Sequence, residues 1–379
     1  MLDSLNFQYF NPVKTATSLN KIALHKFKRN FWGVFSLGFL FLCVLVAVFA
    51  YALAPDNSQN ANQMHLSIHS KSPGFKVKML TIPVVIDQGS SVSDFFFGAK
   101  NADTELPIAG YQLKEGALQA MDYTSDVGEG LKKEFKLSLF PDAKTVDDIP
   151  RLYISNKKFI LGTDKYGRDL LSRMLIGIRI SLAIGFVAVF ISLVIGITLG
   201  AIAGYFGGKI DAAIMWVINV TWSIPTLLLV IAITLALGKG FWQVFIAVGL
   251  TMWVEVARVV RGQVMSVKEM QYVTAARALG YTNWRIITKH ILPNSMAPVI
   301  IISAANFAGA ILIESGLSFL GIGAQPPMPS WGGIIKDHYT YIILGKPYLA
   351  IIPGLAIMSL VTAFMLIGNA LRDALDVRN

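Results

Sequence analysis

Residues able to perform covalent or metal chemistry are sparse in this sequence. It contains no HExxH motif, no G-x-S-x-G nucleophile elbow and no cysteine cluster. Its Gly-Lys pairs lack the upstream glycine and the following Ser or Thr of a phosphate-binding loop. His65 and His69 are four residues apart and could share a metal ion on a helix, but they lie in a polar stretch. We therefore expect no catalytic residue, no metal site and no nucleotide site in this chain.

A second group of candidates lies inside or beside apolar runs, where ionisable and helix-breaking residues often serve function. Glu314 ends the fifth apolar run; it is either a carboxylate held at the outer interface by nearby backbone or a gating residue. Glu255 and Arg258 are three residues apart and predict a surface ion pair. Pro225 interrupts the third run and predicts a kink, which could line a pathway or serve packing alone.

The composition explains why such residues are few. Of 379 residues, 54% are hydrophobic and only 15% are charged, whereas soluble domains are about one quarter charged. Apolar runs longer than about 18 residues are typical of membrane spans. The net charge of +10 then indicates basic cytoplasmic loops rather than a nucleic-acid partner. Cys43 is the only cysteine, which excludes an intrachain disulfide.

Six apolar runs predict six transmembrane helices. They cover residues 33–53, 181–205, 212–237, 241–257, 297–313 and 349–366. The first run is too long for the apolar part of a signal peptide, and no A-x-A-like cleavage site follows it cleanly. Basic residues outnumber acids five to one in residues 1–30 and six to one in residues 258–289. Because short basic loops stay in the cytoplasm, both segments and both termini are expected there.

The segment between the first two spans is expected outside the membrane. Residues 55–150 are polar, with 9 Lys, no Arg and 13 Asp or Glu. Runs such as LTIPVVI (80–86) alternate with Gly, Asn and Asp clusters, which predicts short strands and turns. A disordered loop is the alternative. The many Phe and Tyr residues need burial and favour a small ordered domain.

The cytoplasmic loop 268–293 predicts two short helices. The first covers about 269–279 and is followed by Gly280, which can adopt the positive φ of a helix end. The second covers about 282–292 and is expected to stop at Pro293. Ala275, Ala276 and Ala278 leave the first helix thin on one side, which would permit close approach of a partner. A DNA-reading helix-turn-helix and a plain interfacial connector are alternatives to a docking helix.

This loop resembles the coupling motif of ATP-binding-cassette importer permeases, Glu-Ala-Ala, three residues, Gly, and an Ile-x-Leu-Pro ending. The motif matches at Ala275, Ala276, Gly280, Leu292 and Pro293. Thr274 replaces the Glu of the motif and His290 replaces its Ile. The resemblance implies that these seven residues couple the chain to an ATPase, and the His-Ile-Leu-Pro-Asn ending is similar to the peptide and nickel subfamily.

Four other segments resemble the second permease subunit of dipeptide and oligopeptide importers. They are LGTDKYGRDLLSRMLIGIRISL (161–182), GGKIDAAIMWVINVTWSIPTLLL (207–229), LSFLGIGAQPPMPSWG (317–332) and LRDALD (371–376). The resemblance covers nearly all of 20–53 and 160–379. The outer insert at about 66–150 is longer than expected for the family.

The resemblance implies an all-α, six-helix type I importer permease fold with a small extracytoplasmic insert of mixed or β character. The expected parts are a cytoplasmic segment 1–32, a first helix 33–53, an insert 54–160, and a five-helix core 161–379. The chain would be a multi-pass inner-membrane permease that moves di- or oligopeptides. Nickel, glutathione or an antimicrobial peptide are alternative cargoes; an ion channel or an intramembrane enzyme is an alternative class.

The resemblance also implies the partners. They are a second homologous permease, two ATPase subunits that bind ATP and Mg²⁺, an external solute-binding protein and the lipid bilayer, with no nucleic acid. No cofactor is expected in this chain. We expect the 66–150 insert to contact the binding protein or the second permease.

Overall fold

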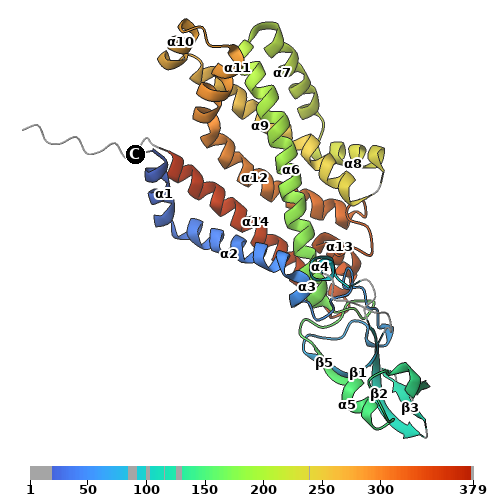
Figure 1. The fold of residues 1–379 in the computed structure, drawn as a ribbon. Helices are drawn as coiled ribbons and strands as arrows, with labels where there is room; N and C mark the ends of the chain where they lie inside the picture. Colours follow the sequence, from blue (N-terminus) through green and yellow to red (C-terminus); the bar gives the residue numbers. More distant parts are fainter. Residues whose placement is uncertain are drawn as a thin grey trace, which may run out of the picture.

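The computed structural model describes residues 19–83, 92–99, 103–114, 116–124, 130–238 and 240–376. Within them the chain forms long helices with a small β-sheet at one end (Figure 1). Five helical segments of this part are long and apolar enough to cross a membrane. They are Phe31–Val48 (α2), Leu170–Phe206 (α6), Phe241–Val267 (α9), Asn283–Phe319 and Tyr348–Leu375 (α14). The expected helical membrane class is confirmed.

The third predicted span is broken in two. Helices α7 (Gly208–Ser223) and α8 (Thr226–Leu237) meet at an angle of 95°, and as one bent span they raise the number to six. Pro225 between them has no N–H to donate, and its ring forces Ile224 into extended backbone with φ −90° and ψ 128°. The kink predicted at Pro225 is therefore present.

Two helices continue beyond their apolar cores. The N-terminus of α6 lies well before the predicted residue 181, because Asp169 caps the helix by accepting the N–H of Ser172 at 2.9 Å. Helix α9 likewise continues past residue 257 to Val267. Hydropathy detects only the apolar part of a helix that lies in the lipid. The polar turns at the two ends of the helix are therefore not predicted by it.

The expectation that the second loop helix stops at Pro293 is wrong. Helix α11 (Asn283–Ile286) passes through one π turn (Ile287–Ile291) directly into α12 (Leu292–Phe319), and Pro293 lies in the first turn of α12. Proline clashes with the carbonyl four residues earlier in a regular helix. The wider π turn directly before Pro293 relieves this conflict, so the chain continues without a break.

Close packing of α6 against α9 depends on three glycines spaced four residues apart. A Cβ on Gly196, Gly200 or Gly204 would lie 2.5 to 2.7 Å from atoms of α9, including the carbonyl oxygens of Ala257 and Arg261. Small residues at this spacing let two membrane helices approach closely, where dispersion and packing hold them together. A side chain at any of the three positions would force α6 and α9 apart.

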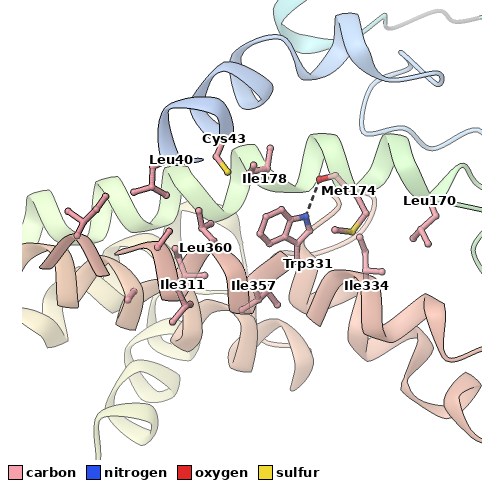
Figure 2. Close-up of a cluster of buried hydrophobic side chains, with 14 of the residues drawn as sticks. Leu40, Cys43, Leu170, Met174, Ile178, Ile311, Trp331, Ile334, Ile357 and Leu360 are labelled. Atoms are coloured by element: carbon pink, nitrogen blue, oxygen red, sulfur yellow. Dashed lines mark hydrogen bonds between the residues drawn. The ribbon is translucent and has the colours of Figure 1, made fainter. Parts of the chain in front are cut away.

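The end of the bundle near the sheet is joined by a buried apolar cluster (Figure 2). Helix α13 (Trp331–His338) packs here against α6 and α14. The indole Nε1 of Trp331 donates to the carbonyl oxygen of Met174 in α6 at 3.0 Å, and Leu40 of α2 and Leu360 of α14 belong to the same cluster. The indole thus satisfies its one polar atom inside an apolar core.

The predicted outer domain contains an antiparallel five-stranded sheet. Its order is β4 (Lys132–Lys136), β3 (Ala117–Asp122), β2 (Thr104–Lys114), β1 (Phe75–Ile82) and β5 (Ile154–Phe159). Leu80, Ile108, Leu118 and Phe140 are fully buried in its core, beside α5 (Asp148–Tyr153). The expected small insert of mixed or β character is confirmed. Residues 84–86 of the predicted 80–86 strand lie outside the described residues.

Short helices complete the chain. They are α1 (Leu19–Arg29), α3 (Ala50–Leu53), α4 (Val92–Phe97) and α10 (Gln271–Ala278). Residues 1–18 of the expected N-terminal segment 1–32 lie outside the described residues. The sheet and α10 lie at opposite ends of the molecule, and α6 runs along the helical bundle from the end near α7 and α11 to the end that borders the sheet domain (Figure 1).

His338 links α13 to the segment before α6. Its Nε2 accepts the backbone N–H of Lys165 at 3.1 Å, and its Nδ1 lies 2.7 Å from the carbonyl oxygen of Ile334. One ring nitrogen that accepts and one that faces a carbonyl require the neutral imidazole. Burial lowers the pKa of His338 below its usual value, and burial also lowers the pKa of His65 to about 4.

Acidification should therefore loosen the end of the bundle near the sheet, where His338 joins α13 to the segment before α6. Because the folded pKa of each histidine is lower than the unfolded pKa, the unfolded state binds more protons below pH ~6.5, and stability falls as the pH falls. We expect the free energy of unfolding to fall by about 2 kcal/mol or more between pH 7.5 and 5, which should appear as a lower unfolding temperature in nanodiscs. His338→Gln keeps a neutral acceptor and should show a smaller acid effect. An equal effect in both proteins would contradict the role of His338.

Candidate functional site

The loop 268–293, which the sequence predicts to be cytoplasmic, begins with α10 and a sharp left-handed turn. Gly280 has φ +77°. The N–H of Gly280 donates to the carbonyl of Arg277 at 2.9 Å, and the N–H of Tyr281 donates to the carbonyl of Ala276 at 3.2 Å. These two bonds form a Schellman end, which satisfies carbonyls that the helix leaves free. The turn expected at Gly280 is present.

The three alanines of α10 do not share a face. Ala276 is only 4% exposed and packs with Val273 and Ile291 against the chain itself. Ala275 and Ala278, three residues apart, are both exposed. The expectation that all three thin the partner-facing side is therefore wrong for Ala276, because helical spacing turns it toward the core of its own chain.

The free side of the loop carries large apolar residues. Leu279 is 72% exposed and Trp284 is 71% exposed. Thr274 and Pro293 are also exposed, while Leu292 packs partly against the buried apolar cluster of the loop. Large exposed apolar side chains gathered on one loop are typical of a protein interface.

A shallow groove adjoins this surface and contains His290. The His290 and Tyr281 rings stack at 5.7 Å between centroids, and the Arg285 guanidinium lies 4.1 Å from the centre of the Tyr281 ring. The lining residues are Tyr281, Trp284, Arg285, Thr288, Lys289 and His290. Three stacked side chains give the groove a rigid wall, with cations at its rim.

Polar contacts tie the loop to the bundle. The Tyr205 hydroxyl at the end of α6 donates to the Asn283 side chain at 2.8 Å, and Lys268 Nζ donates to the carbonyl of Gly204 at 3.0 Å. Arg261 of α9 binds both carboxylate oxygens of Asp211 in α7, at 2.5 and 2.6 Å. Sequence reasoning missed these partners because they are dozens of residues apart and no local spacing joins them.

The break of the third span opens a cavity of about 300 Å³. Ile224 and Thr226 line it from either side of Pro225, together with Glu255 of α9 and Asn306 of α12. The side-chain nitrogen of Asn306 is buried and has no hydrogen-bond partner within the described residues. Pro225 itself makes the break and is not among the lining residues.

The expected ion pair of Glu255 with Arg258 is absent among the described residues. Arg258 instead stacks on Trp222, with its guanidinium carbon 3.6 Å from the ring centre, and donates to the Asn219 side chain at 3.1 Å. A planar guanidinium loses little hydration on an aromatic face. Glu255 is therefore left facing the cavity.

Glu314 is buried near the C-terminal end of α12. It is 1% exposed, and one carboxylate oxygen accepts the Ser318 hydroxyl at 2.6 Å. The other oxygen has no hydrogen-bond partner within the described part of the chain. The expected backbone partner is thus replaced by a hydroxyl. Glu314 does not line the cavity at the Pro225 break, so the structure does not bring these two candidates together.

The two histidines considered for metal binding do not converge. His65 is buried and His69 is exposed, on either side of a single 3₁₀ turn, Leu66–Ile68. Within the described ranges, no group of three or more His, Cys, Asp or Glu residues could hold a metal ion.

Two family models match this sequence. Residues 196–378 match the binding-protein-dependent transport system inner membrane component. Residues 18–73 match the N-terminal TM domain of oligopeptide transport permease C. The first match includes the cytoplasmic loop and the cavity at the Pro225 break.

Curated relatives extend this similarity. A dipeptide transport system permease protein of Alkalihalophilus pseudofirmus is 44% identical over 57% of this chain and 70% of the relative. A glutathione transport system permease protein of Pectobacterium atrosepticum is 42% identical over 57% of this chain and 71% of the relative. An oligopeptide transport system permease protein of Haemophilus influenzae is 42% identical over 58% and 70%.

The turn at Gly280 yields a direct test. Gly280→Val should destabilise the loop by at least about 1 kcal/mol, because a side chain in the left-handed region is strained. No atom lies within 4 Å of an added Cβ, so the effect is conformational and not steric. Gly280→Asn is the control, since Asn tolerates this conformation. We expect proteolysis within the loop to accelerate in the Val variant only; equal rates in both would contradict the requirement for positive φ.

Proposed function

This chain belongs to the binding-protein-dependent transport system inner membrane components, as a permease of an ATP-binding-cassette importer, and we propose that its cytoplasmic loop docks an ATPase subunit. The exposed apolar surface of Ala275, Ala278, Leu279 and Trp284 carries this proposal. It lies at the end of the molecule opposite the sheet, where a cytoplasmic partner would meet it (Figure 1).

Docking would act on the helices through the anchors of the loop. At the end of α6, the Tyr205 hydroxyl donates to the Asn283 side chain. The carbonyl of Gly204 accepts a hydrogen bond from Lys268. The π turn joins the loop to α12 without a flexible linker. A displacement of the docked loop would therefore shift α6 and α12 together, which is how ATPase closure would change access to the transport path.

The transport path would run along the cavity at the Pro225 break. Backbone away from regular helix is tolerated at membrane depth only where protein or water covers it. Glu255, Asn306 and the hydroxyls of Thr221 and Thr251 give this cavity polar groups in an otherwise apolar setting. A second, similar permease would close the path from the other side.

We propose di- or oligopeptides as the cargo. The named relatives transport dipeptides, oligopeptides or glutathione, which is itself a small peptide. ATP and Mg²⁺ would be bound by two partner ATPase subunits, and an external binding protein would deliver the peptide. The sheet domain would then contact that protein or the second permease.

Substitutions at Ala275, which is exposed, and at Ala276, which is buried, test the docking surface. Ala275→Trp places a large ring on the exposed face, and should lower peptide uptake and ATPase copurification about tenfold, equal to about 1.4 kcal/mol of docking energy. Its membrane level and unfolding temperature should stay at wild-type values. Ala276→Trp must overpack the buried cluster and should lower the unfolding temperature. Wild-type uptake and copurification by Ala275→Trp would refute docking at this face.

The proposed orientation of the chain in the membrane is tested by labelling single cysteines introduced into a Cys43→Ala variant. Leu131→Cys lies beside the sheet and Leu279→Cys lies in the loop, and both positions are highly exposed. A membrane-impermeant maleimide should label the first in sealed spheroplasts and the second only after lysis, because basic loops stay in the cytoplasm. Labelling of residue 279 in sealed spheroplasts would overturn the proposed orientation.

A further inference from the structure

We propose that a second cavity, at the outer end of the bundle, binds the C-terminal carboxylate of the peptide cargo. This inference rests on the proposed peptide-import function and adds a site to it. The cavity has a volume of about 380 Å³ and lies between the first turn of α6, the loop before α13, and α13 itself. Its volume falls in the range of roughly 300 to 1,000 Å³ that is usual for small-ligand sites.

Positive charge dominates its walls. Arg168, Arg173 and Lys336 line the cavity, and the only acidic residue among the lining residues is Asp337. Asp337 is already engaged by Lys165, whose Nζ lies 3.0 Å from the Asp337 carboxylate. A concave site with an excess of one charge attracts the opposite charge. The ligand should therefore carry a negative group.

Arg173 is the group best placed to bind it. The residue is only 5% exposed, and its Nε has no hydrogen-bond partner in the described part of the chain. Its Nη1 reaches the carbonyl of Asn60 only at 3.5 Å. A buried guanidinium with unused donors is costly unless an acceptor arrives, and its planar fork matches a carboxylate.

The nearest acid does not supply that acceptor. One oxygen of Asp164 accepts Nε of Arg168 at 2.6 Å, and the other accepts the N–H groups of Tyr166 and Arg168 at 2.8 and 2.9 Å. Arg173 Nε remains 3.7 Å from Asp164. Asp164 thus makes its side-chain hydrogen bond with Arg168 and forms only a longer ion pair with Arg173. Within the described residues, the Nε–H of Arg173 is left without a hydrogen bond and can donate to a ligand.

The remaining walls suit the rest of a small peptide. Met64, Pro326, Pro327 and Met328 provide apolar surface, while Gln325 and Ser330 are polar. Gln325 donates its side-chain amide to the carbonyl of Gly323 at 2.8 Å, so its position is fixed. A site with one charged anchor and an apolar wall would accept peptides of varied side chains.

The test uses the purified transporter complex in nanodiscs without its binding protein. The probes are the dipeptide Ala-Phe and its C-terminal amide, measured by calorimetry. We expect the dipeptide to bind, and the amide to bind at least about tenfold more weakly, as expected for loss of a charged hydrogen-bond pair. Arg173→Gln should weaken dipeptide binding to a similar extent, and Lys336→Gln to a smaller one. Lys158→Gln removes an exposed charge on the sheet and should change nothing.

Several results would overturn the proposal. Equal binding of dipeptide and amide would do so, as would wild-type affinity in well-folded Arg173→Gln. If Arg173→Gln fails to fold, Lys336→Gln and the amide still decide the outcome. Absence of dipeptide binding, with weaker docking of the binding protein in the variants, would assign the site to an acidic side chain of that protein instead. Normal peptide uptake without direct binding would overturn this inference alone, whereas no uptake by the wild-type complex would overturn the proposed function.

Discussion

Close contact between α6 and α9 is the interaction on which the rest of the structure depends. The glycines at 196, 200 and 204 leave no room for a Cβ against α9, so the two backbones act as one rigid unit. Both ends of α6 then carry other elements. At its end near the sheet Trp331 and the Asp169 cap fix α13 and the preceding segment, and at its other end Tyr205 holds the loop 268–293. Separation of α6 from α9 would disturb both ends together.

Two large irregularities in the helices lie where protein or a cavity covers the backbone. A membrane-spanning backbone must satisfy its own polar groups unless protein or a cavity covers it. The 95° break at Pro225 borders a cavity with polar side chains, and the π turn at Ile287–Ile291 lies in the last part of the loop, with Ile287 and Ile291 buried. Both irregular segments therefore lie where the chain has polar or protein cover. Their positions coincide with the two parts of the molecule for which we propose transport and coupling.

The sequence predicted features that local physics determines, and missed those that depend on distant contacts. The apolar runs, the positive φ at Gly280 and the kink at Pro225 follow from lipid, from backbone sterics and from the missing proline N–H. The burial of Ala276 and the continuation through Pro293 depend on packing and on a π turn that periodicity does not reveal. Arg258 could pair with Glu255 by spacing, yet it stacks on Trp222, which is far away in sequence.

The two ends of α6 differ in how they are held. At the end near the sheet, Asp164 pairs with Arg168, Ser172 accepts the N–H of Asp56, and Thr163 donates to the carbonyl of Ile68. These groups are buried, and breaking one partner of such a network leaves a costly unsatisfied charge or dipole. Among the described residues, the side-chain hydrogen bonds that join α6 to the loop 268–293 are the part-buried contacts of Tyr205 and of Lys268. The loop end of α6 is therefore held mainly by apolar packing, in which Ala201 and Tyr205 belong to the same buried cluster as Val273 and Ala276. The end near the sheet is held by a buried polar network, so the two ends of α6 are fixed by different kinds of interaction.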